Sequence, residues 1–368
     1  MPVILEKDYP FGDMPKPVVQ PGEFVFAAMY MDHAHIIGMC EALIGAGAVL
    51  KAFYDPDPAK VTAFRRSFPG AAAAESEDEI LKDPQVRLVA AAAITSERCA
   101  LGMRVMRAGK DYFTDKAPMT TLRQVEQARA CVRETGRKYL CYFAERLHTD
   151  AGVFAERLIK AGAIGRMIHM DGFGPHRLNP ATRPEWFFDK EKSGGILCDI
   201  GSHQIEAFLQ YSGNEDARVV FSRVANYHHP AHPGFEDFGD CMVTGANGAT
   251  FYFRVDWFTP DGLSAWGDSR VLIVGTEGTL ELRKTLDPAV EGSVSNVVIL
   301  VDKEGEHRFC VEDKIGAPFF GQMLLDCINR TENAMTQEHC FKAAELCITA
   351  SQKAIHIKTG GDDENGNQ

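Results

Sequence analysis

The sequence lacks the features that would tie a protein to a membrane or to nucleic acid. No run of about 18 apolar residues occurs, so we expect no membrane-spanning helix. Residues 1–22 are polar and proline-rich, without the basic and then apolar order of a secretory signal peptide, which favours a cytoplasmic location. Basic residues are scarce, with 39 Lys and Arg against 51 Asp and Glu and a net charge of −12, whereas nucleic-acid binding needs a basic face. We therefore expect no membrane partner and no nucleic-acid partner.

Paired cysteines are also missing. The ten cysteines are scattered singly without a C-x-x-C pair, and several lie in apolar runs, for example Cys131, Cys141 and Cys241. This pattern is typical of reduced thiols in a protein core rather than of a disulfide framework. The histidine-rich segment 228–232 contains a proline that breaks helical spacing, so we interpret it as a loop and expect no metal.

The residues that are present indicate two domains of ordinary globular composition. The 368 residues exceed what one hydrophobic core usually supports, and 45% of them are hydrophobic and 24% charged. Up to about residue 145, apolar strand-like runs alternate with segments of helical spacing, which predicts a doubly wound parallel sheet that binds ligands at the carboxyl ends of its strands. The predicted strands are 24–29, 49–54, 88–93, 112–114 and 138–143, and the predicted helices are 34–46, 58–68, 97–108 and 122–135.

Beyond about residue 145 the pattern predicts a mostly antiparallel sheet with helices on one side. The dipeptide Asn247-Gly248 predicts a tight hairpin within it. Because a sheet with an open face tends to pair with another copy, we expect a homodimer or homotetramer formed through this sheet. The predicted strands are 166–173, 217–225, 240–244, 250–257, 270–274, 279–282, 297–301 and 308–311, and the predicted helices are 149–160, 199–211, 319–330 and 339–357.

The glycines of a phosphate-binding turn are absent after the first predicted strand. A dinucleotide-binding unit normally carries G-x-G-x-x-G there, but Met29 and Met31 occupy the first two glycine positions and Ala34 the third. Alanine is tolerated at the third position, whereas side chains at the other two limit the approach of the backbone to a pyrophosphate. A carboxylate is nevertheless present at the tip of the second strand, where Asp55 would bind the ribose diol of NAD and repel the 2′-phosphate of NADP.

The segment 194–203, Gly-Gly-Ile-Leu-Cys-Asp-Ile-Gly-Ser-His, places an acid four residues before an imidazole. On a helix that starts near Asp199, Asp199 and His203 lie on one face, one turn apart. An imidazole beside a carboxylate exchanges a proton near neutral pH, and the glycines let the backbone approach a flat ligand ring. An N-cap aspartate followed by a solvated helix histidine is the alternative interpretation of this spacing.

Together these features resemble the Gfo/Idh/MocA family, the glucose–fructose oxidoreductase and inositol dehydrogenase group. Besides the alternating first half, segment 108–116 is similar to the family's A-G-K-x-V-x-x-E-K-P, and segment 194–203 is similar to G-G-x-x-x-D-x-G-x-H. The resemblance covers roughly residues 23–357. It implies an α/β fold with an N-terminal Rossmann-type doubly wound parallel sheet and a C-terminal α+β domain with a mostly antiparallel open sheet.

The resemblance also implies the following division of the chain. An N-terminal extension (1–22) precedes a dinucleotide-binding domain (23–144) and a substrate and oligomerisation domain (145–337). A C-terminal helix then packs back on the Rossmann domain and ends in a frayed tail (338–368).

The resemblance identifies candidate site residues. The family's catalytic lysine, aspartate and histidine match Lys116, Asp199 and His203. The positions that contact the cofactor match Met31, Asp32, His33, Asp55, Ile94, Thr95 and Lys116, with Glu145 facing the nicotinamide region. A polar and aromatic loop before the glycine pair suits a polyol or sugar, although its tryptophan could equally pack against the dinucleotide or the core. The candidate substrate-binding residues in this loop are His176, Arg177, Arg183 and Trp186.

The chain departs from the family's pattern next to the lysine. Asp115 replaces a glutamate, and Ala117 stands where the family has proline, with Pro118 one residue later. Whether the peptide bond after the lysine is cis, as in the family, is therefore left open, because cis bonds before residues other than proline are costly. Together with the missing glycines, these changes bear on cofactor affinity more than on chemistry.

The expected function is that of an NAD-dependent oxidoreductase acting on a secondary hydroxyl of a sugar, polyol or sugar derivative. His203 would exchange the hydroxyl proton, Asp199 would orient the imidazole or bind a neighbouring hydroxyl, and Lys116 would stabilise alkoxide character, while NAD carries the hydride. Two other functions stay open. One is an NAD-dependent lyase or glycoside-cleaving enzyme that oxidises a hydroxyl transiently, and the other is a non-enzymatic ligand-sensing protein of the same fold.

Overall fold

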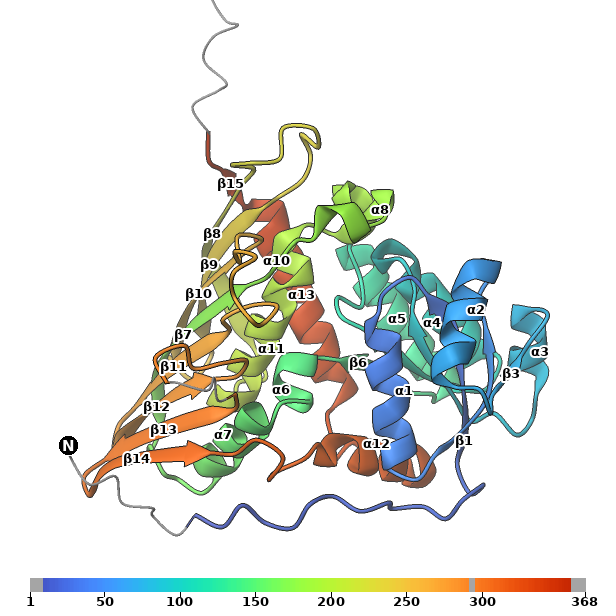
Figure 1. The fold of residues 1–368 in the computed structure, drawn as a ribbon, viewed down its shortest axis with the longest axis horizontal. Helices are drawn as coiled ribbons and strands as arrows, with labels where there is room; N and C mark the ends of the chain where they lie inside the picture. The colour runs from blue at the N-terminus through green and yellow to red at the C-terminus, as the bar shows by residue number, and fades with distance from the viewer. Residues whose placement is uncertain (1–8, 291–294, 359–368) are drawn as a thin grey trace, which may run out of the picture. The chain divides into compact units, whose positions relative to one another are not determined.

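The computed structural model describes residues 9–290 and 295–358, and the chain forms two compact units (Figure 1). One unit, called the Rossmann unit below, comprises Met14–Phe143 and Ala317–Glu345. The other, called the sheet unit, comprises Ala144–Gly316 with the described parts of Met1–Asp13 and Leu346–Gln368. Among the described helices, none combines the length and the apolar character needed to cross a membrane.

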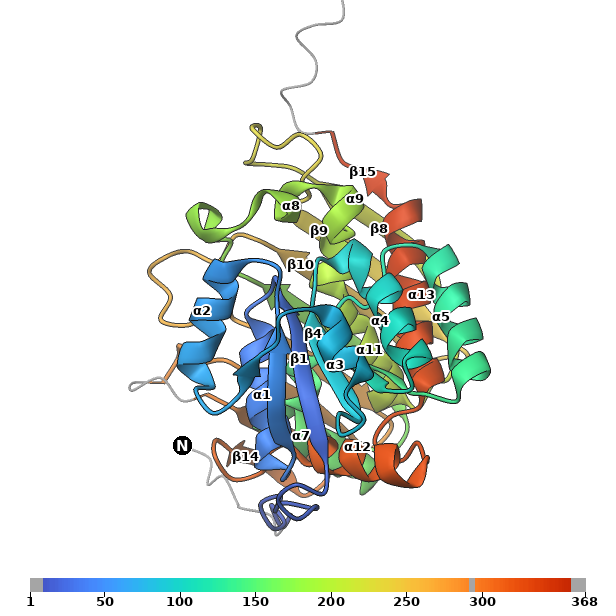
Figure 2. The same cartoon turned by 90° about the vertical axis from the view of Figure 1, so that its right-hand side faces the viewer.

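The Rossmann unit contains a parallel sheet with the strand order β3-β2-β1-β4-β5-β6. Its central strands β1 and β4 lie side by side in Figure 2. The strands are β1 (Val25–Met31), β2 (Val49–Tyr54), β3 (Ala72–Ala73), β4 (Leu88–Ala92), β5 (Asp111–Asp115) and β6 (Tyr139–Tyr142). The order reverses between β1 and β4, where doubly wound sheets bind ligands. Every residue of β4 and β5 is buried, as expected for central parallel strands covered on both faces.

The helices of the Rossmann unit begin and end at residues with recognisable capping chemistry. Asp57 accepts a hydrogen bond from Ala59 N at the start of α2, with Pro58 at the first helical position, and Thr121 and Gln124 form a reciprocal capping box on α5. The predicted strands and helices of this half are confirmed, whereas β3 and α3 lie outside the predicted elements. The helices are α1 (His35–Gly45), α2 (Pro58–Ser67), α3 (Glu77–Lys82), α4 (Arg98–Arg107), α5 (Leu122–Thr135) and α12 (Pro318–Asn329), with a 3-10 helix η1 (Thr95–Glu97).

The sheet unit contains a mixed, mostly antiparallel sheet with the strand order β14-β13-β12-β11-β7-β10-β9-β8-β15. Two neighbouring pairs, β7 with β10 and β8 with β15, are parallel. The predicted hairpin at Asn247-Gly248 joins the antiparallel strands β9 and β10 and is confirmed. The strands are β7 (Met167–Pro175), β8 (Ala217–Ala225), β9 (Phe238–Gly245), β10 (Thr250–Asp256), β11 (Arg270–Gly275), β12 (Gly278–Arg283), β13 (Val297–Asp302), β14 (Gly305–Cys310) and β15 (Ile355–His356).

Helices cover one face of this sheet. α7 contacts β12 and β13, and α11 contacts β7 and β10 (Figure 1). Phe208 of α11 stacks on Phe251 of β10 with the ring centroids 5.0 Å apart. Along β11 the side chains alternate, since Ile273 is buried while Leu272 and Val274 are 40% and 41% exposed on the opposite face. The helices are α6 (Ala144–Leu147), α7 (Asp150–Lys160), α8 (Glu185–Phe188), α9 (Lys190–Ser193), α10 (Ile196–Asp199) and α11 (Gly201–Ser212), with a 3-10 helix η2 (Pro180–Thr182).

The last helix, α13 (Gln337–Lys353), differs from its prediction. It belongs to the Rossmann unit up to Glu345 and to the sheet unit beyond. Its predicted end at residue 357 is wrong, because Ile355 and His356 pair with β8 instead of continuing the helix. The proposed frayed tail lies outside the described residues. The structure also groups residues 317–345 with the Rossmann unit and divides the N-terminal extension at Asp13.

Candidate active site

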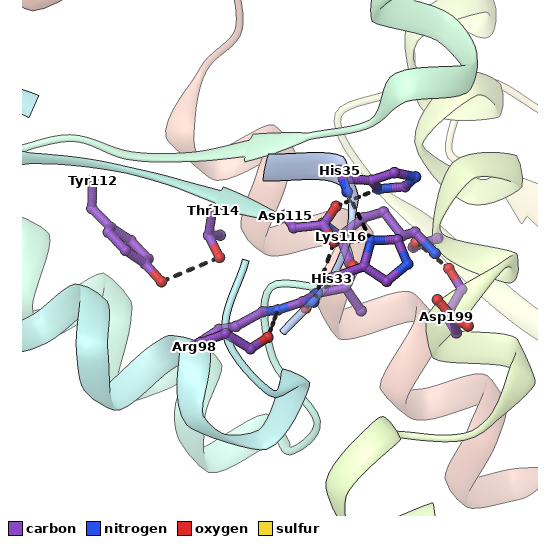
Figure 3. Close-up of polar contacts among 11 residues, drawn as sticks. His33, His35, Arg98, Tyr112, Thr114, Asp115, Lys116 and Asp199 are labelled. Atoms are coloured by element: carbon purple, nitrogen blue, oxygen red, sulfur yellow. Dashed lines mark hydrogen bonds and ion pairs between the residues drawn. The ribbon is translucent and has the colours of Figure 1, made fainter. Parts of the chain in front are cut away.

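The carboxyl end of β5 carries a fully buried carboxylate, Asp115, on which three nitrogen-bearing side chains converge (Figure 3). His35 Nδ1 lies 2.8 Å from Asp115 Oδ1, and His33 Nδ1 lies 3.2 Å from Asp115 Oδ2. The guanidinium of Arg98 reaches Oδ2 at 3.2 Å. The histidines follow β1 and the arginine begins α4 after β4, so one network joins the carboxyl ends of β1, β4 and β5.

The same arginine holds the backbone around Lys116. Arg98 Nε donates to Ala93 O at 2.7 Å, and Nη1 donates to Lys116 O and, at 2.9 Å, to Ala117 O. Lys116 N donates to Asp115 Oδ1 at 2.8 Å, and the peptide bond between Lys116 and Ala117 is cis. The local conformation of the lysine segment is therefore set by two buried side chains. No sequence motif singles out Arg98.

The Asp115 network has a defined charge state. Burial opposes ionisation of Asp115, but His35, Arg98 and His33 outweigh it and hold the pKa of the carboxyl well below its usual range. Burial, with His35 beside it, lowers the pKa of His33 to about 4. Ligating atoms of His33, His35 and Asp115 lie within 4.8 Å of one another. Because Arg98 already neutralises the carboxylate, we interpret the group as a hydrogen-bond network rather than a metal centre.

The turn that lacks the glycine fingerprint is supported by a tyrosine. Tyr30 has φ +57°, a left-handed conformation that favours glycine, and the pairing of β1 with β4 is irregular at this residue. Its hydroxyl donates to Glu77 Oε2 at 2.7 Å, and its ring makes an edge contact with Tyr54. Met29 is fully buried, so its side chain belongs to the core of the unit. The contacts of its side chain thus hold Tyr30 in a left-handed conformation, which a glycine would adopt without such contacts.

The carboxylate of Asp55 closes the same turn. Its Oδ2 accepts from Met31 N at 2.7 Å and its Oδ1 from Asp57 N at 2.9 Å. Asp32 pairs with Lys60 at 2.6 Å, which offsets the negative charge that Asp32 places near the start of α1. The predicted cofactor-binding residues at or just beyond the carboxyl ends of strands in the Rossmann unit are Met31, Asp32, His33, Asp55, Ile94, Thr95 and Lys116.

In the sheet unit, the glycine pair packs against a buried carboxylate. Gly194 ends α9 with φ +87°, and Gly195 precedes α10 with φ +78°. A Cβ atom on Gly195 would lie 2.3 Å from Glu236 Oε2, the atom that accepts from Ile196 N at 3.0 Å. Lys190 Nζ pairs with Glu236 Oε1 at 2.5 Å. The close approach of Glu236 is a sufficient reason for glycine at position 195.

Asp199 and His203 stand on consecutive helices. The predicted helix over 199–211 is present as α11, which begins at Gly201, two residues after the predicted start, while Asp199 ends α10. The break follows from the short turn at Ile200, whose carbonyl accepts from His203 N at 3.1 Å. Asp199 does not cap α11, and His203 is only 3% exposed. The alternative of an N-cap aspartate and a solvated histidine is therefore wrong.

Asp199 lines a pocket with aromatic walls. Phe187, Phe188, Phe235 and Trp257 form the apolar part of the lining. The polar part comes from Asp199, from Ser193 and from the ion pair of Lys190 with Glu236. The pocket therefore offers flat apolar surfaces together with carboxylate, hydroxyl and ammonium groups.

Two of the predicted substrate-binding residues lie beside this pocket. The guanidinium of Arg183 lies 4.5 Å from the ring centroid of Phe187 and 5.2 Å from that of Trp257. Burial lowers the pKa of Arg183, and the nearby carboxylate of Asp199 acts in the opposite direction. Trp186 is half-buried and makes an edge contact with Phe187 at 6.0 Å. Arg183 thus lies within electrostatic reach of Asp199.

The other two predicted substrate-binding residues mainly contact the loop after β10. The ring of His176 lies 4.4 Å from that of Trp266 and 5.6 Å from that of Trp257. Arg177 donates to three carbonyls of this loop, at 2.9, 3.5 and 2.5 Å. The loop folds back onto its own unit at Trp257, which is 6% exposed, whereas Trp266 is 46% exposed.

Glu145 lies at the centre of a buried polar cluster in the sheet unit. Its Oε2 accepts from Lys284 Nζ at 2.7 Å, from Ser269 Oγ at 2.9 Å and from Gln204 Nε2 at 3.2 Å, and all four residues are buried. Burial opposes ionisation, but Lys284, His203 and His176 outweigh it and lower the pKa of Glu145 below its usual range. Lys284 and Ser269 flank strands that carry no recognised motif, so the sequence patterns do not single them out.

The histidine-rich segment forms the predicted loop. The buried carboxylate of Asp237 accepts from His228 N at 2.8 Å and from His229 Nδ1 at 2.9 Å, and the ring of His232 stacks on Phe188 at 4.0 Å. In this part of the described chain, no three ligating side chains come together.

Known protein families match both units of the chain. Residues 30–143 match the model of an oxidoreductase family with an NAD-binding Rossmann fold, and residues 153–281 match the GFO/IDH/MocA C-terminal domain. The crystal structure of a candidate oxidoreductase from Erwinia carotovora atroseptica SCRI1043 is 50% identical, with a TM-score of 0.88, and covers 91% of this chain and 100% of that chain.

Two curated relatives are more distant. The scyllo-inositol 2-dehydrogenase (NAD(+)) of Bacillus subtilis (strain 168) is 27% identical over 251 residues, which are 64% of this chain and 69% of that protein. The D-xylose dehydrogenase of Paenarthrobacter nicotinovorans is 30% identical over 131 residues, so this match spans 34% of that protein. With both domain models matched in order and a near-complete structural match at 50% identity, the chain belongs to the Gfo/Idh/MocA family of oxidoreductases.

Proposed function

We propose that the chain is an NAD-dependent dehydrogenase that oxidises or reduces a secondary hydroxyl of a sugar, polyol or sugar derivative. The observation that carries this proposal is the aromatic-walled pocket lined by Asp199, with the buried His203 four residues further along the chain on α11. Aromatic faces suit the C–H surface of a sugar ring, and carboxylates bind its hydroxyls. The names of two relatives, dehydrogenases of scyllo-inositol and D-xylose, support the same substrate class.

The Rossmann unit fits a dinucleotide. A carboxylate, Asp55, follows β2, and the start of α1 lies at the carboxyl edge of the sheet, where a helix N-terminus attracts a phosphate. We propose that NAD binds in preference to NADP, since a carboxylate at this position repels a 2′-phosphate. When bound, NAD would accept or return the hydride. The residues proposed to hold it are Met31, Asp32, His33, Asp55, Ile94 and Thr95.

We assign the remaining chemistry to three side chains. His203 exchanges the hydroxyl proton as general base or acid, because an imidazole works near neutral pH. Asp199, in the pocket wall, binds a neighbouring hydroxyl. Lys116, whose backbone Arg98 and Asp115 hold in place, stabilises the developing alkoxide with its ammonium group.

We further propose that the protein is a homodimer or homotetramer formed through the face of the large sheet opposite its helices. Leu272 and Val274 on β11 and Val301 on β13 are each at least 40% exposed. Apolar side chains on a broad sheet face are typical of a surface that a second copy covers.

A substrate screen tests the proposed activity. Polyols, sugars and sugar acids are incubated with the protein and with NAD or NADP, and the absorbance of the reduced cofactor is followed. We expect an increase with NAD and at least one polyol or sugar. Turnover without net NADH would favour the lyase or glycoside-cleaving alternative, and absence of NAD(H) binding by calorimetry would favour the sensing protein.

A further inference from the structure

Arg183 is a half-buried arginine of the sheet unit to which the proposed chemistry assigns no role. Its guanidinium lies 4.5 Å from the ring centroid of Phe187 and 5.2 Å from that of Trp257. Both rings line the pocket that also contains Asp199. Two aromatic side chains therefore hold a positive charge beside the pocket in which we place the substrate.

Most hydrogen-bond donors of the Arg183 guanidinium have no protein acceptor. Nε donates to Leu178 O at 2.9 Å, but in the described part of the chain no carboxylate forms an ion pair with Arg183. The other Lys and Arg side chains of segment 176–195 each have a carboxylate partner: Arg177 reaches Asp261 at 3.6 Å, Lys190 reaches Glu236 at 2.5 Å, and Lys192 reaches Asp189 at 3.8 Å. The N–H groups on both Nη atoms of Arg183 thus remain for a ligand or for water.

We propose that Arg183 binds a carboxylate of the substrate, so that the substrate is a sugar acid rather than a neutral sugar or polyol. A guanidinium is a planar fork whose N–H groups match the two oxygens of a carboxylate, and it stays charged at physiological pH. The inference rests on the proposed function and names its substrate class. Hydroxyls of the same molecule bind to Asp199 in the pocket wall.

The surroundings of Arg183 favour a carboxylate as its partner. Burial lowers the pKa of Arg183, so the charged guanidinium loses hydration at this position, and an anionic ligand compensates for that loss. Phosphate carries more charge than a carboxylate and is commonly bound by several cations. Lys190, in the lining of the pocket, is already engaged by Glu236, which leaves one arginine for one carboxylate.

The test is a calorimetric titration of the full-length protein with acids and their neutral counterparts, in the presence of NAD. The pairs are D-glucuronate with D-glucose, D-galacturonate with D-galactose, D-gluconate with D-glucitol, and D-galactonate with galactitol. Each acid differs from its counterpart only by a carboxylate in place of a CH₂OH group. We expect at least one acid to bind about ten-fold or more tightly than its counterpart, as a hydrogen-bonded charge pair would provide.

Two substitutions at Arg183 test which part of the side chain binds the acid. Arg183→Met keeps an apolar stem beside the rings but removes the charge and the donors. It should raise the Kd of the preferred acid by about ten-fold or more and leave the Kd of the neutral counterpart within about two-fold. Arg183→Lys keeps the charge but loses the planar fork, and it should raise the Kd of the acid by about five-fold.

Arg87→Met is the matched control. Arg87 is also half-buried, lies 5.1 Å from the ring centroid of Phe24, and has no carboxylate partner among the described residues. It belongs to the Rossmann unit, where it precedes β4, and Phe24 is not part of the pocket lining. The Kd of the acid should stay within about two-fold in this variant.

Absence of binding by every acid, or equal binding of the acids and their counterparts, would overturn the inference. An unchanged Kd of the acid in folded Arg183→Met would also overturn it, as would tighter binding of D-glucose 6-phosphate than of every acid. If Arg183→Met does not fold, an unchanged Kd in Arg183→Lys overturns the inference in its place. The titration measures binding alone, so a failed dehydrogenase assay leaves its result unaffected. Turnover of a neutral polyol without any preference for acids would support the proposed function and overturn only this inference.

Discussion

At the scale of single residues, each unit contains a buried carboxylate with a permanent cationic partner. Asp115 pairs with Arg98 in the Rossmann unit, and Glu145 pairs with Lys284 in the sheet unit. Removing either partner would leave an uncompensated buried charge, which is strongly destabilising. Each carboxylate therefore acts as a fixed negative charge, and that of Asp115 accepts a hydrogen bond from Lys116 N.

His33 makes a testable contribution to the pH dependence of stability. Its pKa is about 4 in the folded protein and about 6.5 in an unfolded chain, so between these values the unfolded state binds more protons. This contribution to the free energy of unfolding is complete above pH 6.5 and is lost as the pH falls towards 4. In His33→Asn, the loss of stability between pH 7 and pH 4.5 should be smaller by about 1–2 kcal/mol, allowing for solvent screening of a side chain that is 19% exposed.

Urea unfolding at the two pH values measures this difference. His228→Asn, at an exposed histidine, controls for the substitution itself. A variant at position 33 that loses as much stability on acidification as the unaltered protein would contradict the assignment.

Candidate reactive residues could be proposed from the sequence, whereas the residues that contact them could not. Lys116, Asp199, His203 and Glu145 could be named from motifs, because the family pattern fixes their neighbours in the chain. Lys284 could not, because it meets Glu145 across 139 residues of sequence and nothing local distinguishes it from a surface lysine. Contacts of this kind depend on the tertiary fold.

At the scale of elements, the glycine pair before α10 allows a buried carboxylate to approach the backbone. Gly195 combines φ +78° with a Cβ position 2.3 Å from Glu236 Oε2. Gly213, which ends α11, has φ +66° but nothing within 4 Å of its Cβ position. The two glycines therefore separate the cost of a left-handed conformation from the cost of a steric clash.

Gly195→Ala should destabilise the protein more than Gly213→Ala. The left-handed conformation alone costs about 1–2 kcal/mol, which is the change expected for Gly213→Ala. The clash with Glu236 adds about 1–3 kcal/mol in Gly195→Ala. Chemical denaturation of both variants measures the difference, and equal destabilisation would show that Glu236 moves aside without cost.

Long periodic elements could be predicted from the sequence, and short or non-local ones could not. α5 was predicted with its observed limits from its helical spacing and the glycine that follows it, and the structure adds a capping box at its start. α8 and α9 have four residues each, too few to show a period. The chain leaves α13 at Lys353 because Ile355 pairs with β8, a contact across more than 130 residues that local propensity does not encode.

At the scale of the whole molecule, family membership rests on matches to both units. We expect the oligomer to form through the open face of the large sheet. We predict a solution mass of at least twice the chain mass of 40.6 kDa by size-exclusion chromatography with light scattering. Leu272→Lys combined with Val274→Lys should reduce it to one chain. Val49→Lys, at a comparably exposed valine of the Rossmann unit, is the control and should keep the larger mass. A monomeric unaltered protein would contradict the proposal.

The central claim is that Lys116, Asp199 and His203 carry a net hydroxyl oxidation with NAD. The most direct test measures NADH and oxidised product together, with a substrate found in the screen, for the unaltered protein and for His203→Ala and Lys116→Ala. We predict one NADH per product molecule and a kcat lowered by about 100-fold or more in each variant. Product without matching NADH, or near-normal turnover in either variant, would contradict it.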